Sequence, residues 1–99
     1  MKRNRNLPLT ETVFYILLAL KKPMHGYLIM QEVEELSKGH VRIAAGTLYG
    51  AVDNLLKLKF IKLVPNEDKR RKVYERTELG SEILRLDVER MDHMVRIAK

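Results

Sequence analysis

Hydrophobic residues recur at helical spacing in the first third of the chain and predict two helices. The first begins after Thr10, a residue that suits an N-cap position, and apolar side chains between residues 13 and 20 cover most of its circumference. We therefore expect this helix to be buried on several sides and to end at the Lys-Pro pair 22–23. The second helix is predicted from residue 24 or 25 to residue 37.

The segment from about residue 45 to residue 59 is predicted to form a third helix with two contrasting faces. Its apolar face consists of Leu48, Val52, Leu55 and Leu56. The opposite face carries small or polar residues, namely Gly46, Gly50, Asp53, Asn54 and Lys57, with Tyr49 at the flank. Glycines on the exposed side let that face approach another surface closely, as binding in a major groove about 12 Å wide requires.

Three short runs have the character of strands. Residues 41–43 are compatible with a brief strand, and residues 60–64 and 72–76 are predicted to pair as a β-hairpin. The connection over residues 65–71 is rich in turn-forming and basic residues, so the hairpin has a charged tip. Thr77 then caps a last helix that continues to the C-terminus.

The last predicted helix carries an apolar seam with 4-3-4-3 spacing, about two heptads long. The seam consists of Leu84, Val88, Met91, Val95 and Ala98. A stripe of this kind is unusual on a soluble monomer, so we expect a homodimer in which the seam contacts a second copy. Two heptads are short for a coiled coil, so the first helix should also pack against the partner's last helix. Alternatively, the adaptable side chains of Met91 and Met94 admit a small ligand.

Three compact helices, a two-stranded wing and a final helix predict a mainly α protein with a winged helix-turn-helix fold. We expect residues 1–76 to form the DNA-binding domain and residues 77–99 to form a dimerisation helix in the same compact unit. A length of 99 residues, 45% of them hydrophobic, fits a single globular domain. The longest apolar run is too short to span a bilayer, so we expect a cytoplasmic protein without membrane contact.

The net charge of +6 is concentrated in two segments. Residues 1–10 carry three basic residues and no acidic one, and residues 57–76 carry eight basic residues against three acidic ones. Clustered positive charge favours an anionic partner, and double-stranded DNA is the partner that fits a winged helix. A merely solvated charged surface accounts for the total charge but not for its placement.

Two predicted surfaces offer candidate DNA contacts: the basic hairpin tip and the polar, glycine-containing face of the third helix. Four consecutive cations at the hairpin tip, Lys69, Arg70, Arg71 and Lys72, are suited to phosphate oxygens. On the third helix, Thr47, Asn54 and Lys57 can donate to base edges or phosphates, and Gly50 leaves room for the groove. The Tyr49 hydroxyl can reach a phosphate, or the ring can simply flank the core. Asp53 repels phosphate, so it must accept from a base, pair locally or lie off the contact.

Catalytic and metal-binding functions find little support in the sequence. Absence of cysteine excludes disulfides, cysteine-ligated zinc and thiol nucleophiles. Glu89 and His93 lie four apart on one helix, but two ligands do not make a metal site. The chain has no glycine-rich phosphate loop and no Ser-His-Asp set in a plausible context. We therefore expect no enzymatic activity, no metal and no cofactor.

Three stretches together resemble the signature regions of PadR-type transcriptional regulators. They are Met24-His25-Gly26-Tyr27, Gly46-Thr47-Leu48-Tyr49 and the run from Arg71 to Gly80. The resemblance implies a dimeric winged helix-turn-helix repressor that binds an inverted-repeat operator, often released by a small aromatic or amphipathic effector. It also implies that Gly46, Thr47 and Tyr49 begin the recognition helix, that residues 69–72 form the wing, and that His25 and Tyr27 lie near the DNA backbone.

The chain departs from the family pattern at two places. Ala44 and Ala45 replace the usual Ser-Pro before the recognition helix, and Gly50 replaces a proline, so we expect a less rigid helix N-terminus. Lys57-Leu58-Lys59 replaces the usual Glu-Glu-Gly turn before the wing. The length is similar to that of the short subgroup with one dimerisation helix.

A function of another class competes with DNA recognition. A winged helix can serve as a protein–protein interaction module, with its basic wing contributing solubility or contacting an acidic protein. Salt dependence discriminates between the two, because duplex binding releases condensed counterions and binding to an acidic protein surface does so far less.

Overall fold

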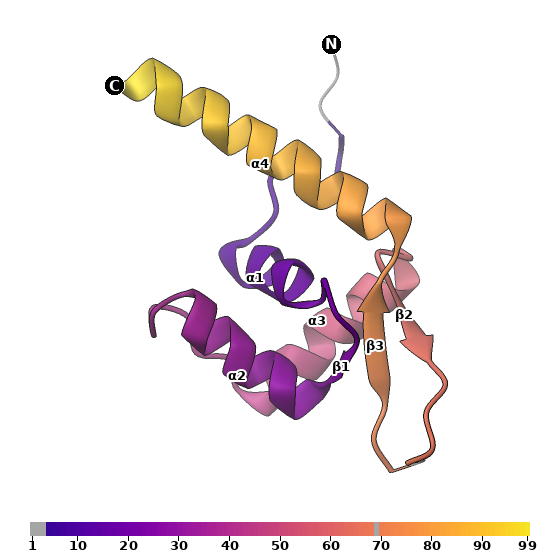
Figure 1. Cartoon of the computed structure of the whole chain (residues 1–99). Coiled ribbons are helices and arrows are strands. Elements are labelled where there is room, and N and C mark those ends of the chain that lie inside the picture. Colours follow the sequence, from indigo (N-terminus) through magenta and orange to yellow (C-terminus); the bar gives the residue numbers. More distant parts are fainter. Residues whose placement is uncertain (1–3, 69) are drawn as a thin grey trace.

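The computed structural model describes residues 4–68 and 70–99, in which four helices and a small three-stranded sheet occur in the order α1, β1, α2, α3, β2, β3, α4. The helices are α1 (Glu11–Ala19), α2 (Gly26–Leu36), α3 (Ala45–Lys57) and α4 (Glu78–Ala98). The strands are β1 (Met24–His25), β2 (Ile61–Val64) and β3 (Val73–Arg76). Figure 1 shows α4 lying across α1, the β2–β3 hairpin projecting on the other side, and the C-terminal end of α4 extending beyond the other elements. The mainly α winged-helix prediction is confirmed.

Side-chain caps fix where three of the helices begin. Thr10 accepts a hydrogen bond from Val13 N (3.1 Å), and Thr77 accepts one from Gly80 N (3.0 Å). The His25 imidazole performs the same function for α2. In contrast, Ala44 gives α3 no side-chain cap, as expected for alanine, which has no side-chain acceptor.

One continuous core holds these elements together, with contributions from every helix and from the hairpin. Its fully buried members include Ile16, Leu17, Ile29, Leu48 and Ile61. The predicted apolar face of α3 lies in this core, whereas Gly46, Gly50, Asp53, Asn54 and Lys57 are exposed, as predicted. Within the described residues, no helix combines the length and apolar character that crossing a bilayer requires.

The predicted strand at residues 41–43 is wrong. Val41 and Ile43 are buried with Arg42 exposed between them, but the segment pairs with no strand among the described residues. Instead, the Ser37 hydroxyl accepts from Val41 N (2.9 Å) and lies 3.3 Å from Val41 O, so a side chain satisfies the backbone there.

The third strand of the sheet comes from residues that sequence reasoning assigned to the start of a helix. Met24 and His25 pair with Tyr74 and Val73, which places β1 at one edge of an antiparallel sheet ordered β1-β3-β2. The sheet therefore joins the α2 N-terminus directly to the wing.

The base of the wing is fastened to α1 and α4 by polar contacts. The Thr77 hydroxyl donates to Lys59 O (2.7 Å), and Thr77 N donates to Phe60 O (3.1 Å). Arg76 donates to Leu17 O (2.9 Å) at the end of α1. A Cβ at Gly80 would lie 2.0 Å from Phe60 O, so only glycine permits this approach of α4 to the hairpin.

Candidate nucleic-acid interface

The outward side of α3 carries polar side chains separated by glycines. Thr47, Asp53, Asn54 and Lys57 are exposed, and a Cβ at Gly46 or Gly50 would meet no atom within 4 Å. Because described side chains leave these glycines uncovered, another molecule can approach the α3 backbone closely. The structure thus brings the predicted α3 residues to one accessible helix.

Tyr49 leans from the flank of α3 toward the first turn of α2. A Cβ at Gly26 would lie only 2.7 Å from Tyr49 Oη, so the tyrosine hydroxyl occupies space that a larger residue would need. Tyr49 is 47% exposed, which makes it neither a core residue nor a freely solvated one. Gly26 and Tyr49, from two of the family-like stretches, are therefore a matched pair.

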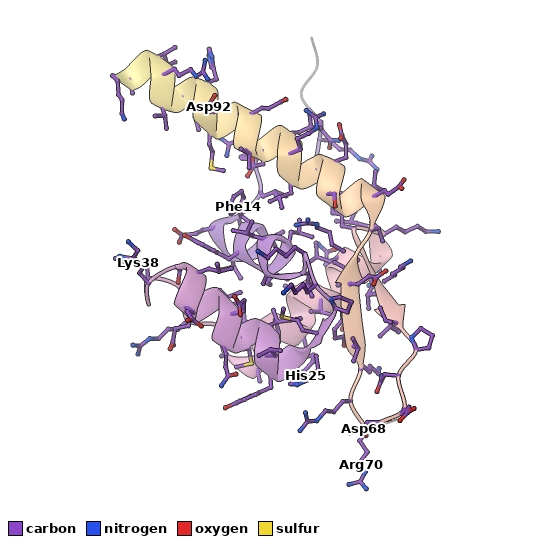
Figure 2. The ribbon with its side chains drawn as sticks, in the orientation of Figure 1. Phe14, His25, Lys38, Asp68, Arg70 and Asp92 are labelled. Carbon is purple, nitrogen blue, oxygen red and sulfur yellow. The ribbon has the colours of Figure 1, made fainter. Side chains whose placement is uncertain are left out.

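Turn chemistry orders the tip of the wing. Asp68 Oδ1 accepts from Arg70 N (3.0 Å), and the Asn66 amide donates to Arg71 O (3.0 Å). These contacts fix the backbone that carries Arg70, Arg71 and Lys72, all of which are exposed. In Figure 2 the Arg70 side chain extends away from the hairpin tip. Lys69, the fourth predicted cation, lies outside the described residues, as do Lys2 and Arg3 of the basic N-terminus.

A cavity of about 390 Å³ lies where the wing, the α2 N-terminus and α3 meet. Six of its lining residues are predicted DNA contacts, namely His25, Tyr27, Tyr49, Arg70, Arg71 and Lys72. The other three lining residues are Gly26, Asp53 and Tyr74. Among the described residues, no carboxylate forms an ion pair with the three wing cations. The cavity is therefore rich in cations that have not been neutralised, a composition suited to an anion.

Tyr74 is the member of this site that the sequence did not single out. It is 3% exposed, and burial raises the pKa of its hydroxyl, with smaller contributions from Tyr49 and Asp53. The hydroxyl is thus a neutral donor at ordinary pH. Strand alternation marks Tyr74 as inward-facing, but only the pairing of β3 with β1 brings it beside the α2 N-terminus.

Four predicted DNA contacts lie outside the cavity lining. Thr47, Gly50 and Lys57 are exposed on α3, and Asn54 lines a smaller cavity beside the segment that precedes α1. These residues and the cavity present two kinds of surface, one bare and polar and one cationic.

The predicted dimer seam divides into two parts. Leu84 is buried in the chain's own core, so it belongs to the fold rather than to an exposed seam. Val88 and Val95 are about half exposed, Met91 is half-buried, and Ala98 is exposed. Ile97, which is not a member of the predicted seam, is 71% exposed and widens the apolar surface at the free end of α4.

Charges on α4 pair with one another, unlike Arg70, Arg71 and Lys72 at the wing tip. Arg85 bridges Glu82 and Glu89, and Asp92 pairs with Arg96 (3.0 Å). Hydrogen bonds to Arg85 lower the pKa of Glu82, while Glu82 raises that of Arg85. On this solvent-facing side of α4, the charged side chains are paired within the helix itself.

Comparison with known proteins identifies the family. Residues 15–86 match the transcriptional regulator PadR-like family. A PadR family transcription regulator from Clostridium difficile is 25% identical, with a TM-score of 0.76 over 89% of this chain and 94% of that one. RosR of H. salinarum is 26% identical, with a TM-score of 0.73 over 87% of this chain and 76% of that one.

A more distant structure shares the fold alone. Sso10a-2, a DNA-binding protein from Sulfolobus solfataricus, is 19% identical, with a TM-score of 0.70 over 97% of this chain and 86% of that one. Comparison with curated protein sequences gives no significant match. The family match covers well over half of the chain, and with the winged-helix fold it shows that the protein belongs to the PadR-like family of transcriptional regulators.

Proposed function

We propose that this regulator is a repressor that binds an inverted-repeat operator as a homodimer. The observation that carries the proposal is the juxtaposition of unpaired wing cations with the uncovered glycines of α3. In this arrangement α3 enters the major groove, where Thr47 and Asn54 donate to or accept from base edges. Arg70, Arg71 and Lys72, with Lys69, contact phosphates, and Lys57 adds a cation from α3.

The free end of α4 supports the dimer. Val88, Met91, Val95, Ala98 and Ile97 expose apolar surface on a part of α4 that extends beyond the other described elements (Figure 1). A second copy would cover this surface, with α1 of each chain packing against the partner's α4. Two-fold symmetry would set two recognition helices about 34 Å apart, one duplex turn.

The decisive experiment selects duplexes from a random pool with the purified protein and then measures affinity against salt concentration. We expect an enriched inverted repeat and a linear fall of log affinity with log salt, because bound cations release counterions. Thr47→Ala and Asn54→Ala should each relax preference at particular base pairs by about 1–3 kcal/mol. Failure to enrich any sequence would contradict specific readout.

A protein–protein module remains the alternative function that the same experiment excludes or supports. If the basic wing contacts an acidic protein, duplex affinity should be weak, equal for every sequence and independent of Asn54→Ala. The uncovered glycines of α3 favour DNA, because an acidic protein partner has no need of a helix backbone open to a groove.

Release by a small aromatic or amphipathic effector completes the proposal. A cavity of about 280 Å³ between α1 and α4 supports it, because Phe14, Tyr15 and Met91 line that cavity beside the proposed dimer surface. A ligand there would change how α4 sits on α1. Compounds that release the protein from the selected duplex should lose that effect in Met91→Ala, with the duplex affinity of the same variant measured without compound as the reference.

A further inference from the structure

Asp53 places a carboxylate on the face of α3 that the chain leaves open. Gly46, Gly50, Asp53 and Lys57 follow one another at intervals of four, three and four residues, so they form one stripe along the helix. All four residues are exposed, and a Cβ at either glycine would meet no atom within 4 Å. Because glycine has no side chain, this stripe presents only the side chains of Asp53 and Lys57.

The carboxylate of Asp53 has no local partner among the described residues. Arg70, Arg71 and Lys72 line the same cavity, yet none of these cations lies within ion-pair distance of Asp53. The hydrogen bonds that carboxylates accept in the described part of the chain all go to other residues. Asp53 therefore neither holds the wing in place nor stabilises α3 through a side-chain contact.

A negative charge at this position opposes DNA binding in general. The phosphates on both sides of a major groove are anionic and repel a carboxylate. The net charge of +6 attracts any duplex, whereas Asp53 weakens that attraction unless the duplex offers it a hydrogen-bond donor. A group that penalises every sequence except those with a matching donor is a source of specificity.

The donors of the major groove are the exocyclic amino groups of cytosine and adenine. An ionised carboxylate can only accept hydrogen bonds, so these amino groups are what it can contact favourably there. The amino group of adenine lies between two acceptors, a ring nitrogen of adenine and a carbonyl of thymine, and both repel a carboxylate. The amino group of cytosine has one neighbouring acceptor, the guanine carbonyl, and a C–H group on its other side. Cytosine is therefore the better match for Asp53.

We propose that Asp53 determines sequence specificity by accepting a hydrogen bond from the amino group of one cytosine in each half-site of the operator. This inference rests on the proposed DNA binding and adds one base contact to it. Gly46 and Gly50 let the α3 backbone approach the groove, so that the short side chain of Asp53 reaches a base edge. Thr47 and Asn54, which lie beside the stripe, are left to contact neighbouring base pairs.

Selection from a random pool of duplexes with Asp53→Ala and Asp53→Asn tests the contact. For the wild type we expect one position per half-site at which replacing cytosine weakens binding about tenfold. Asp53→Ala should accept all four bases nearly equally at that position and keep the wild-type preference elsewhere. Asp53→Asn should shift the preference there to adenine, because an amide offers the acceptor and the donor that adenine matches.

Binding to an unrelated duplex provides a second readout, which a purely structural role would not move. Removing the carboxylate relieves repulsion, so both variants should bind this duplex more tightly than the wild type does while they discriminate less. Glu35→Gln is the charge-matched control, because Glu35 is exposed on α2 and lies outside the cavity. It should leave the base preference unaltered at every position.

A change in the DNA alone tests the contact with the unaltered protein. Each cytosine of the selected duplex is replaced in turn by pyrimidin-2-one, which lacks only the exocyclic amino group. At one cytosine per half-site the wild type should lose about tenfold in affinity, and Asp53→Ala should lose far less. The effects of the two changes are then non-additive, as expected for groups in direct contact.

Three results would overturn the proposal: an unaltered preference in both variants, a preference that relaxes equally at every position, or additive effects of the protein and base changes. A wild type that tolerates pyrimidin-2-one at every cytosine would overturn it without any variant. If the wild type selects no duplex, the proposed function fails. If it selects one and Asp53→Ala retains the same preference, only this contact fails.

Discussion

Gly80 and Gly50 are both helix glycines, yet their surroundings are opposite. A Cβ at Gly80 would lie 2.0 Å from a backbone oxygen of Phe60, whereas a Cβ at Gly50 would meet nothing within 4 Å. At Gly80 the chain itself uses the missing side chain to bring α4 against the hairpin. At Gly50 the described chain makes no use of it, so the space is there for a partner.

The same contrast separates the charges of the two regions. Arg85 and Arg96 on α4 have carboxylate partners within one or two turns, while Arg70, Arg71 and Lys72 at the wing tip have none among the described residues. Where the chain itself fills the space at a glycine or pairs a charge, that surface serves the fold. Where the space stays open and the charge has no partner, we expect a partner molecule to bind. Substitutions at the first kind of surface should change stability, and substitutions at the second kind should change binding.

The largest expected effect is on DNA binding by Gly50→Glu. Bulk and negative charge on the uncovered face of α3 should remove specific binding, a loss of at least about a thousandfold. Gly50→Ala should instead leave the fold slightly more stable, by about 0.5–1 kcal/mol, because alanine suits a helix better than glycine. Duplex binding and thermal unfolding of both variants provide the measurements. Intact specific binding by Gly50→Glu would mean that another face of α3 meets the DNA.

Gly80→Ala should reverse this pattern. The added methyl group meets the Phe60 backbone, so we expect a loss of about 3 kcal/mol of unfolding free energy through overpacking. Urea unfolding monitored by circular dichroism measures it, with His93→Ala at an exposed position of the same helix as the control. A Gly80→Ala protein as stable as the wild type would show that the junction can relax without cost.

Met91→Asp tests the apolar surface that α4 leaves open. The carboxylate would enter the proposed interface between copies, so we expect monomers and an operator affinity about a hundredfold lower, since half-sites would bind singly. Sedimentation at micromolar concentration and duplex titration measure the two effects. His93→Asp is the charge-matched control on the exposed side of α4. A wild-type monomer, or a fully binding Met91→Asp dimer, would contradict the dimer.

Neutralising Arg70 and Arg71 together should weaken binding to all duplexes about equally, because phosphate contacts carry no sequence information. The slope of log affinity against log salt should fall by about two per protomer, or about four for the proposed dimer. Removing two cations from α4, Arg85→Ala with Arg96→Ala, controls for net charge and should leave the slope nearly unchanged. An unchanged slope in the wing variant would remove the wing from the interface.

The smallest expected effect concerns Lys59, which has a φ of 64°. A left-handed conformation costs a residue with a Cβ about 1 kcal/mol, so Lys59→Gly should stabilise the protein by up to that amount. Chemical denaturation measures the gain, and Lys57→Gly, inside α3, should instead destabilise. A loss of stability in Lys59→Gly would show that the lysine makes compensating contacts.

Local patterns predicted most of this fold, and non-local pairing accounts for what they missed. Helical spacing located all four helices, and Thr10 and Thr77 marked two of their starts correctly. The pattern could not distinguish residues 41–43 from a strand, because their alternating burial depends on Ser37 rather than on a partner strand. It could not find β1 either, since two residues become a strand only when β3 lies beside them.

The candidate site was predicted in parts rather than as an assembly. Charge and the family-like stretches identified His25, Tyr49 and Arg71 separately. Their meeting in one cavity depends on β1 pairing with β3, a contact between residues nearly fifty positions apart. Leu84 shows the converse limit, because a heptad pattern does not reveal which of its members the chain buries in its own core.

The hydrogen bonds at the base of the wing hold the start of α4 firmly, so a tilt of this helix and a movement of the wing are coupled. Thr77 ties the start of this helix to Lys59 and Phe60, and Gly80 allows no slack between them. The 21 residues of α4 extend about 30 Å from these contacts. In the proposed dimer, a small change in the crossing angle between the two α4 helices would move both wings relative to the duplex. Binding of an effector near the α4 seam would thereby change DNA contacts that lie far from it.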